Sequence, residues 1–427
     1  MQRRRLDPPA GPLLAEDDGA LLRARGIRYG RAARFSAPQP IPPWSDVLDT
    51  TTRGPACPQL PSRLEWVTGP VVDGLAMSED CQVLSVTAPS DANGLPVMVW
   101  FHGGAYVSGS GEAPKYDADD LARRGRVVVV RVTYRFGVLG YLSPSGVDNL
   151  GLRDQILALE WVHTNIGAFG GDPDRVTVFG QSAGADSVLS LTLCAQTAGL
   201  FRSAIMQSAP LGIRDGRDAM TAAMRTAANA ITTGELLDTQ TAAVAAAAPF
   251  GLIGSMPFGP IMGSDPLPAA SEADGRLADA ARRIELLVGY TRNDGAPFVA
   301  MNPRIARLKR PGPVGAVIER TASAALTRRV FGMPARRLAK TWRRNGGQAA
   351  TFRVDWSPAR MRACHCIELP LLFDAPAWVD APMLGGAPVD ERLADTVRRN
   401  WAGFAHDGIA GLDSSVMTRR SRGIGFG

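Results

Sequence analysis

The chain has 427 residues, 45% of them hydrophobic, and its 47 Lys and Arg against 41 Asp and Glu give a net charge of +6. This length and apolar content are ample for a large core and suit one large α/β domain or two smaller ones. The basic balance does not indicate a nucleic-acid partner, because the arginines are scattered apart from Arg3–Arg5 and Arg419–Arg420, and neither run is interleaved with aromatics.

The start of the chain does not read as a secretion signal. Arg3–Arg5 are followed by LDPPAGPLLAEDDGA, in which prolines and acids replace the apolar region of a leader. No apolar stretch reaches the length of a membrane span. The cysteines are sparse and odd in number, which predicts no disulfide framework; they are Cys57, Cys81, Cys194, Cys364 and Cys366. We therefore expect a cytoplasmic protein without stable membrane insertion.

In chain order, residues 1–25 are polar, contain prolines and lack periodicity, so we expect a flexible N-terminal segment there. From Pro96 onward, continuous apolar, β-branched runs alternate with helical patterns. The runs typical of buried strands are 96–101, 126–134, 175–179, 201–208, 283–291 and 350–356.

Helical patterns fill the intervals between these runs. They are 149–169, the Ala-rich segment 217–248, the Arg- and Ala-rich segment 301–345, and 390–408. The alternation predicts an α/β protein with a mostly parallel sheet and helices on both faces. We expect one domain over residues 26–410, followed by a flexible tail over 411–427.

The most informative segment is VTVFGQSAGADSVLS, residues 176–190. A β-rich run meets the glycine-flanked Ser182, and a helix-forming stretch follows. This is the pattern of a nucleophile elbow, in which a strained turn exposes the serine Oγ beside the N–H of Ala183 and a helix N-terminus. The alternative is a plain strand-to-helix turn with Ser182 as the N-cap, because G-x-S-x-G arises by chance in a chain with 46 glycines.

A serine nucleophile needs a base, and the base needs an acid that fixes its tautomer. In α/β-hydrolases, which carry this elbow, the order along the chain is serine, acid, histidine. Only His365 and His406 follow Ser182; His102 and His163 precede it. We favour His365, which lies in a loop after a predicted strand, over His406, which ends a helix and suits a dipole partner.

The acid should lie between the serine and the histidine, at the end of a strand. Asp294 lies just past the predicted strand 283–291 and is followed by Gly295. Its rival is Asp265, which no strong strand precedes. Both also suit plain turns, since Asn293-Asp294-Gly295 is strong turn chemistry.

An oxyanion hole is predicted in FHGGAYVSG, residues 101–109, directly after the first buried strand. Glycines at this place allow backbone N–H groups to point at one spot. The predicted donors are Gly104, Ala105 and Ala183, with Gly103 as a further candidate. The alternative is a plain glycine-rich turn. That alternative does not explain why an H-G-G loop and a G-x-S-x-G elbow occur in one chain.

No metal or organic cofactor is predicted. Cys364-His365-Cys366 are adjacent and make a poor chelate, and no second Cys and His cluster completes four ligands. Tyr106, Phe258 and Trp356 are candidates for a pocket wall, although a core position is the more ordinary place for each.

Together these motifs resemble the type-B carboxylesterases, the family that includes bacterial para-nitrobenzyl esterases and cholinesterases. The resemblance runs from about Gly26 to about Gly408 and is strongest over 78–210, in SEDCQVLSV, PVMVWFHGGAY, NLGLRDQILALEWV and VTVFGQSAGA. It implies an α/β-hydrolase fold with Ser182 as nucleophile, Asp294 as acid and His365 as base. It also implies a reduced helical cap near 217–248 and 301–345.

The resemblance carries further expectations. It implies ion pairs between Arg34 and Glu79 and between Arg135 and Asp172. It places Cys57 and Cys81 where secreted members have a disulfide, and in a cytoplasmic protein we expect both reduced.

The chain also departs from the family pattern. Asp294 stands where most members have Glu, and Gln181 stands where many have Glu. The segments between Ser182 and His365, which form the lid and pocket walls in relatives, are shorter than usual.

We therefore predict a serine carboxylic ester hydrolase that acts on small-molecule esters through an acyl-enzyme. Two alternatives stay open. One is a non-catalytic binding protein on the same fold. The other is an amidase or thioesterase, because acyl-transfer residues do not fix the leaving group.

Overall fold

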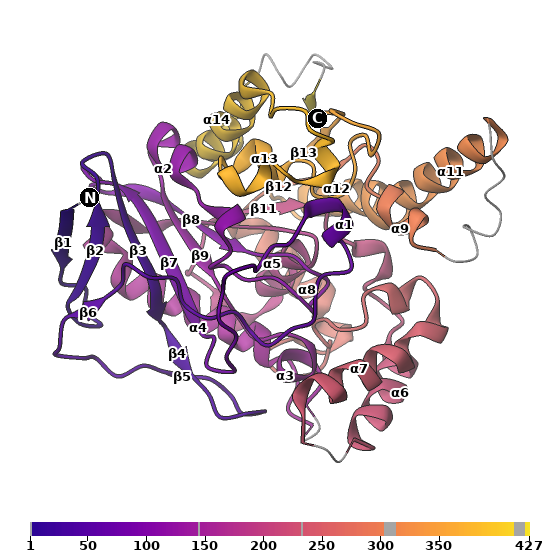
Figure 1. Ribbon diagram of the computed structural model, residues 1–427, viewed down its shortest axis with the longest axis horizontal. Helices are drawn as coiled ribbons and strands as arrows, with labels where there is room; N and C mark the ends of the chain where they lie inside the picture. Colours follow the sequence, from indigo (N-terminus) through magenta and orange to yellow (C-terminus); the bar gives the residue numbers. More distant parts are fainter. Residues whose placement is uncertain (1, 144–145, 232–233, 303–312, 414–422) are drawn as a thin grey trace.

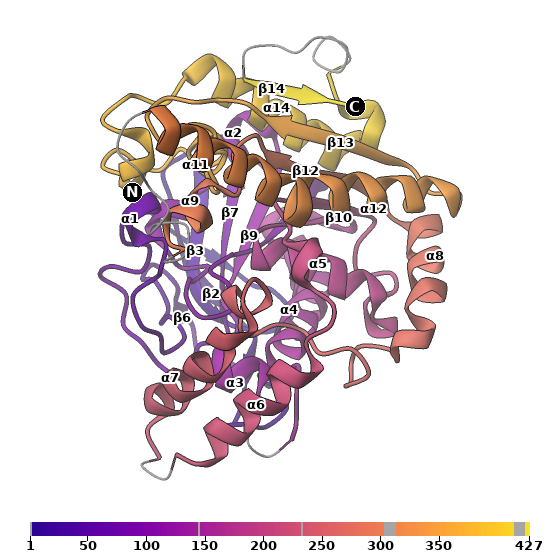
Figure 2. The ribbon, with the colours of Figure 1, turned by 90° about the vertical axis from the view of Figure 1, so that its right-hand side faces the viewer.

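The structure is a computed structural model that describes residues 2–143, 146–231, 234–302, 313–413 and 423–427. One large sheet crosses the molecule, and helices pack around it (Figures 1 and 2). The strands of this sheet are β1 (Gln2–Leu6), β2 (Leu13–Asp17), β3 (Leu21–Arg28), β6 (Leu48–Asp49), β7 (Val83–Pro89), β8 (Leu95–Phe101), β9 (Val128–Val132), β10 (Gly171–Gln181), β11 (Ser203–Gln207), β12 (Glu285–Thr291), β13 (Ala349–Val354) and β14 (Ile424–Phe426). A separate pair joins β4 (Gly30–Arg31) to β5 (Gln39–Pro40).

The strand order is β1-β2-β3-β7-β9-β8-β10-β11-β12-β13-β14, with β6 paired to β2. The central strands from β9 to β13 pair in parallel. The strands on either side of them, β1, β2, β3 and β7 at one edge and β14 at the other, join antiparallel. The predicted parallel sheet is therefore confirmed, with antiparallel strands added at both edges.

The helices connect these strands. They are α1 (Glu65–Thr68), α2 (Asp119–Gly125), α3 (Gly137–Tyr141), α4 (Leu150–Asn165), α5 (Ala183–Leu193), α6 (Asp218–Asn229), α7 (Leu236–Ala247), α8 (Ala273–Arg283), α9 (Ala296–Ala300), α11 (Pro313–Leu326), α12 (Met333–Arg344), α13 (Leu369–Leu372) and α14 (Glu391–Asp407). A π-helical turn, Thr327–Gly332, joins α11 to α12. The segments 217–248 and 301–345 thus contain helices as predicted, and residues 303–312 lie outside the described part.

The central strands are buried on both faces, which explains their continuous apolar runs. In β8, Val97, Val99 and Phe101 join one core together with residues of α4 and α5. Met98 and Trp100 point the other way, into a core shared with α2 and α14. Alternate side chains of each strand therefore hold helices on opposite faces of the sheet.

The N-terminal residues differ from the prediction of a flexible segment, because β1, β2 and most of β3 lie within residues 1–25. These strands pair antiparallel, and in β2 and β3 one face meets the core: Leu13 and Ala15 are fully buried in β2, and Ala24 in β3, whereas β1 buries only Leu6. The other face is solvated and carries charged residues. An antiparallel edge strand of this kind lacks the apolar run that identifies a buried strand.

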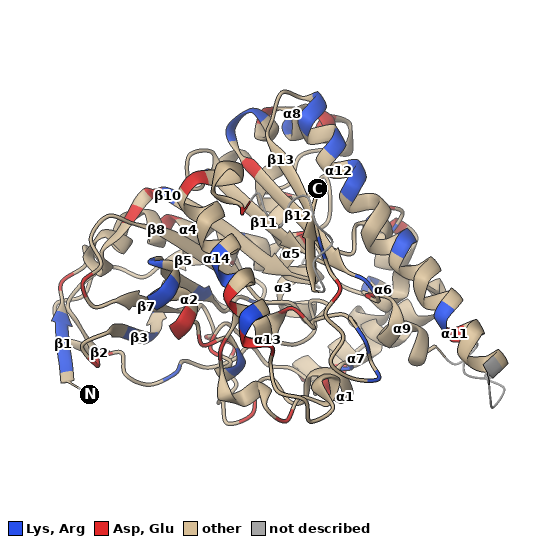
Figure 3. Cartoon of the chain, turned by 90° about the horizontal axis from the view of Figure 1, so that it is seen from above, with Lys and Arg blue, Asp and Glu red and all other residues tan. Residues whose placement is uncertain are grey.

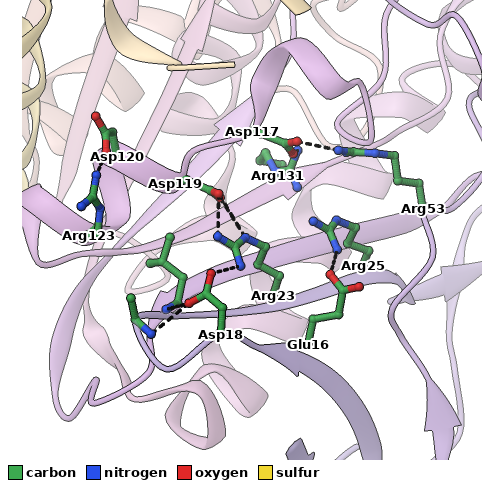
Figure 4. A network of polar contacts seen from close by, with 12 residues as sticks. Glu16, Asp18, Arg23, Arg25, Arg53, Asp117, Asp119, Asp120, Arg123 and Arg131 are labelled. Carbon is green, nitrogen blue, oxygen red and sulfur yellow. Dashed lines mark hydrogen bonds and ion pairs between the residues drawn. The ribbon is translucent and has the colours of Figure 1, made fainter. Parts of the chain in front are cut away.

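Ion pairs connect β3, β9 and Arg53 to the segment at the start of α2 (Figure 4). Arg23 on β3 donates to both carboxylate oxygens of Asp119 at the start of α2, at 2.6 and 3.1 Å, and to Asp18 at 2.8 Å. Asp117 accepts from Arg53 at 2.6 Å and from the buried Arg131 at 2.9 Å. An exposed pair contributes about 0.2–1 kcal/mol, and connected pairs reinforce one another.

The tail also differs from the prediction, since Ile424–Phe426 form β14, antiparallel to β13. Ile424 and Phe426 are buried and alternate with Gly425. A strand of three residues offers too short a pattern to stand out in a sequence. Residues 414–422 lie outside the described part.

The two ion pairs implied by the resemblance have different outcomes. Arg34 pairs with Glu79 as expected. The Arg135–Asp172 pair is wrong: Arg135 binds the buried carboxylate of Asp154 on α4 through its backbone N–H, Nε and Nη2, at 2.8–3.0 Å. β9 and β10 run in the same direction, so Arg135, just after β9, and Asp172, at the start of β10, lie at opposite ends of the sheet.

Basic residues gather on one surface of the fold, and most of them come from one stretch of the sequence, residues 336–344. α12 carries several exposed Arg and Lys residues, and α8 adds more beside it (Figure 3); they are Arg336, Arg337, Lys340, Arg343 and Arg344, with Arg282 and Arg283. The aromatic residue of α12, Trp342, is fully buried on the opposite side. This surface therefore reads as a solvated helix face.

The cysteines of the chain are all free and buried. The neighbouring Cys57 thiol, together with burial, holds the pKa of Cys81 well above its usual range. Across the described ranges, no helix is long and apolar enough to cross a membrane.

Candidate active site

Ser182 lies between β10 and α5 in a backbone conformation that L-residues rarely adopt, with φ 56° and ψ −121°. The glycines around it are required by space. A Cβ on Gly180 would lie 2.5 Å from the carbonyl carbon of Gly184, and one on Gly184 would overlap the Phe101 carbonyl. The segment forms the strand–turn–helix that the sequence predicts, with the serine at its apex.

His365 and Asp294 meet although 71 residues separate them. His365 Nδ1 lies 2.7 Å from Asp294 Oδ1, and neither side chain is exposed to solvent. The loops that carry them are joined by the backbone, because Asn293 N–H donates to Ala363 O at 2.8 Å. Both loops follow adjacent parallel strands, β12 and β13, whose C-terminal ends share one edge of the sheet.

Two further donors hold the Asp294 carboxylate in place. Its Oδ2 accepts the Ser208 hydroxyl at 2.9 Å and the Thr291 backbone N–H at 2.9 Å. Oδ1 therefore remains for the Nδ1–H of His365, which leaves the lone pair at Nε2.

The atom facing Nε2 is the side-chain amide nitrogen of Gln181, at 3.2 Å. Both Ser182 and His365 are described, and in this arrangement they form no hydrogen bond with each other. Such bonds often tighten only when substrate is present. The Gln181 amide and the Ser182 hydroxyl are thus alternative donors to the same lone pair.

The predicted oxyanion loop has an unusual backbone. Gly104, Ala105 and Tyr106 have φ values of 116°, 54° and 57°. The N–H groups of Gly104 and Ala105 donate to no group in the described part of the chain, and Ala183 begins α5, where an N–H has no partner within the helix. Gly103, Gly104 and Ala105 line the same cavity as Ser182 and His365.

Comparison with known proteins agrees with this geometry. Residues 22–311 match the carboxylesterase family. The chain is 38% identical to a probable N-octanoylanthranilate hydrolase of Rhodococcus erythropolis, over 94% of this chain and 92% of the relative. It is 34% identical to the para-nitrobenzyl esterase of Bacillus subtilis strain 168, over 93% of this chain and 88% of the relative.

The chain belongs to the carboxylesterase family. A solved structure named a thermophilic PNB esterase covers 98% of this chain, and this chain covers 93% of it, with a TM-score of 0.78 and 30% identity. The α/β-hydrolase fold and the carboxylic ester hydrolase activity predicted from the sequence are confirmed.

In this carboxylesterase, Gln59 binds the end of the predicted oxyanion loop, a contact that sequence reasoning missed. The Gly109 N–H donates to Gln59 Oε1 at 2.7 Å, and Gln59 Nε2 donates to Gly109 O at 3.0 Å. Tyr106 anchors the loop from inside, since its hydroxyl donates to Asp186 at 2.9 Å. A lone glutamine in a proline-rich segment offers no signal of such a role.

The rival acid and bases of the carboxylesterase lie elsewhere. Asp265 is exposed and pairs with Arg153 at 3.0 Å. His163 is exposed on α4, and His406 Nε2 faces the Gly125 carbonyl at 3.0 Å. None of the three lines the cavity at Ser182.

His102 is fully buried and stacks on Tyr134, with 4.4 Å between ring centroids. Its Nδ1 faces the Gly103 carbonyl at 2.8 Å. Burial lowers the pKa of His102 to about 4. It is therefore a neutral support for the oxyanion loop.

Two aromatic side chains flank the candidate base. The rings of Phe298, on α9, and Phe331, in the π-helical turn, lie 5.2 and 5.4 Å from the His365 ring. Sequence reasoning missed both. Of the candidates it named, Phe258 and Trp356 are buried and do not line the cavities at Ser182.

Glu368 is a buried carboxyl that the sequence did not single out. Burial, and next the charge of Asp294, raise its pKa to about 8. Its oxygens have no well-formed hydrogen bond among the described residues, although the Gln207 amide lies near enough to oppose the rise. The group is therefore largely protonated near neutral pH.

Two cavities open on Ser182. One has a volume of about 360 Å³ and contacts His365 as well as the serine. The other has a volume of about 30 Å³ and contacts the serine and Ala105. Among the described residues, no group of three His, Cys, Asp or Glu is arranged to hold a metal ion.

Proposed function

We propose that this carboxylesterase cleaves its substrates through an acyl-enzyme formed on Ser182, with His365 as general base and Asp294 as the acid that orients it. One observation carries the proposal. The buried 2.7 Å contact between His365 Nδ1 and Asp294 Oδ1 supports Nε2 as the nitrogen with the lone pair, and His365 lines the same cavity as the elbow serine.

The chemistry follows the acyl-transfer scheme. His365 Nε2 takes the Ser182 proton as Oγ attacks the carbonyl, and the Asp294 carboxylate stabilises the imidazolium. The N–H groups of Gly104, Ala105 and Ala183 hold the oxyanion, and such a donor contributes about 10²–10³ in rate. His365 then protonates the leaving group, and water releases the acid.

The departures from the family pattern are compatible with this role. Asp294 is one methylene shorter than Glu, yet its Oδ1 reaches His365 because the strand ends of β12 and β13 bring the two loops together. The mechanism requires no metal or organic cofactor. A small-molecule ester as the class of substrate agrees with the family. The absence of a nucleic-acid partner and a cytoplasmic location stay predictions from the sequence.

The test is hydrolysis of p-nitrophenyl acetate by the pure protein and by Ser182→Ala. We expect the variant to lose at least about 10³-fold in kcat, since the nucleophile is gone. Equal rates for the two proteins would remove Ser182 from the mechanism and favour a non-catalytic binding protein with adventitious hydrolysis.

An amide is the second candidate substrate. The name of the Rhodococcus relative specifies an N-acylated aromatic amine, and an acyl-enzyme can form from an ester, an amide or a thioester. Comparing p-nitroacetanilide with p-nitrophenyl acetate separates the possibilities. Hydrolysis of the anilide that disappears in Ser182→Ala would extend the proposed activity to aryl amides.

A further inference from the structure

The two cavities at Ser182 differ in size and in their contact with the candidate base. From this difference we infer that the enzyme selects substrates with a short acyl group and a large, mainly apolar leaving group. The inference rests on the proposed function, because the roles of Ser182 and His365 decide which cavity holds which part of the substrate.

The mechanism fixes the direction of the substrate. His365 Nε2 must come within hydrogen-bond reach of the leaving atom in order to protonate it. The carbonyl oxygen points to the N–H groups of the oxyanion loop. The acyl chain therefore leaves Ser182 on the side away from His365.

The wide cavity is the one that reaches His365. Its volume of about 360 Å³ lies within the range of pockets that hold small organic ligands, about 300–1,000 Å³. Apolar and aromatic side chains form much of its wall, among them Tyr116, Leu369, Trp378 and Phe298. This cavity receives the leaving group.

The narrow cavity touches Ser182 and Ala105 without touching His365. Its wall is almost wholly apolar and comes from several segments around the elbow; Ile213, Leu252, Met256, Val330 and Phe331 form most of it. This cavity receives the acyl chain.

The volumes set the size limit. A group of the size of a water molecule needs about 10–15 Å³ of cavity volume. The narrow cavity, of about 30 Å³, therefore holds two or three such groups. An acetyl or propionyl chain fits, and a hexanoyl or octanoyl chain does not. The wide cavity holds more than about twenty such groups.

The narrow cavity is also hard to enlarge. Ile213, Met256, Val330 and Phe331 are each at least nine-tenths buried, so their outer sides are packed. Phe331 further packs against the rings of Phe298 and His365. A displacement of this wall by a long acyl chain would disturb the base itself.

The first measurement is a series of p-nitrophenyl esters from acetate to octanoate, with one leaving group throughout. We expect kcat/KM to fall at least about tenfold for each methylene added beyond the longest acyl chain that fits, as for a tight apolar pocket. A second series compares phenyl acetate with 2-naphthyl acetate, whose leaving groups differ in size. The naphthyl ester should react at least as fast.

Variants assign the effect to the narrow cavity. Ile213→Ala should raise kcat/KM for the hexanoate relative to the acetate by about tenfold or more. Ile284→Ala removes the same atoms from the core outside both cavities and should leave the ratio unchanged. Leu252→Ala tests the same wall at a partly exposed position, where folding is less at risk.

The outcomes are distinguishable. If the octanoate ester is hydrolysed as fast as the acetate ester, and Ser182→Ala loses both activities, the size selection is overturned and the proposed function is left intact. If the enzyme hydrolyses esters with long acyl chains and does not hydrolyse 2-naphthyl acetate, the acyl chain and the leaving group occupy the opposite cavities, and the inferred direction of binding is overturned. Acetate hydrolysis that persists in Ser182→Ala overturns the proposed function instead.

Discussion

Replacing Asp294 by Asn tests the proposal that Asp294 sets the tautomer of His365. The two oxygens of Asp294 have different partners: Oδ1 faces His365 Nδ1, and Oδ2 accepts the Thr291 N–H and the Ser208 hydroxyl. The Thr291 N–H is a backbone donor and needs an acceptor. The Asn amide will therefore turn its oxygen to Thr291 and its NH₂ to His365.

The amide in this orientation selects the wrong tautomer. An NH₂ facing Nδ1 requires a lone pair there, so Nε2 carries the proton and cannot take one from Ser182. Turning the amide over leaves the Thr291 N–H and the amide NH₂ facing each other. Each buried unsatisfied donor costs about 1–3 kcal/mol, or about 2–6 kcal/mol for the two. That range corresponds to a loss of between about 30-fold and about 10⁴-fold in rate.

The assay is kcat/KM for p-nitrophenyl acetate, with thermal unfolding measured beside it. We expect Asp294→Asn to fold and to lose activity within the range above. Asp294→Glu is the matched control: it keeps an acceptor at His365 and should retain far more activity than the Asn variant. An Asn variant within threefold of the unmodified enzyme would refute the reasoning about the tautomer.

Three further predictions follow from the same geometry. Gln181→Leu removes the competing donor at His365 Nε2, so the acylation rate in a stopped-flow burst should rise by about two- to tenfold, the value of one neutral hydrogen bond; a tenfold fall would mean that the amide positions His365. Because the pKa of Glu368 is raised to about 8 from an ordinary value of 4.5, the folded state holds a proton that the unfolded state releases, and stability declines as pH rises between these values. Urea unfolding of Glu368→Gln should therefore show a stability gain over the unmodified enzyme that grows towards about pH 8, to at most about 5 kcal/mol, and a gain independent of pH would contradict the assignment. Ser182→Gly relieves the positive φ of the elbow, so it should be more stable to urea than Ser182→Ala by about 1–3 kcal/mol although both are inactive; equal stability would mean that the elbow stores no strain.

Short sequence patterns made much of the candidate site predictable. Ser182 directly follows β10, Asp294 comes three residues after the end of β12, and His365 lies in a loop after β13. These strands form apolar runs in the sequence because both of their faces are buried. Parallel strands carry their C-terminal ends to one edge, so residues after neighbouring strands come together. The sequence order of serine, acid and histidine then leaves few choices.

Features that depend on distant contacts were not predictable. Gln59 supports the oxyanion loop across 50 residues, and nothing near it in the sequence indicates this. Arg135 pairs with Asp154 rather than Asp172 because of strand direction, which is a property of the assembled sheet. Phe331 reaches His365 from a π-helical turn that ordinary helix periodicity does not reveal.

The most direct test of the central claim is covalent trapping of the nucleophile. The pure enzyme is treated with diethyl p-nitrophenyl phosphate, digested and analysed by mass spectrometry. We predict a single diethylphosphoryl adduct on Ser182, formed as activity is lost, and no adduct in Ser182→Ala. An adduct on any other residue, or inactivation that leaves Ser182 unmodified, would contradict the account.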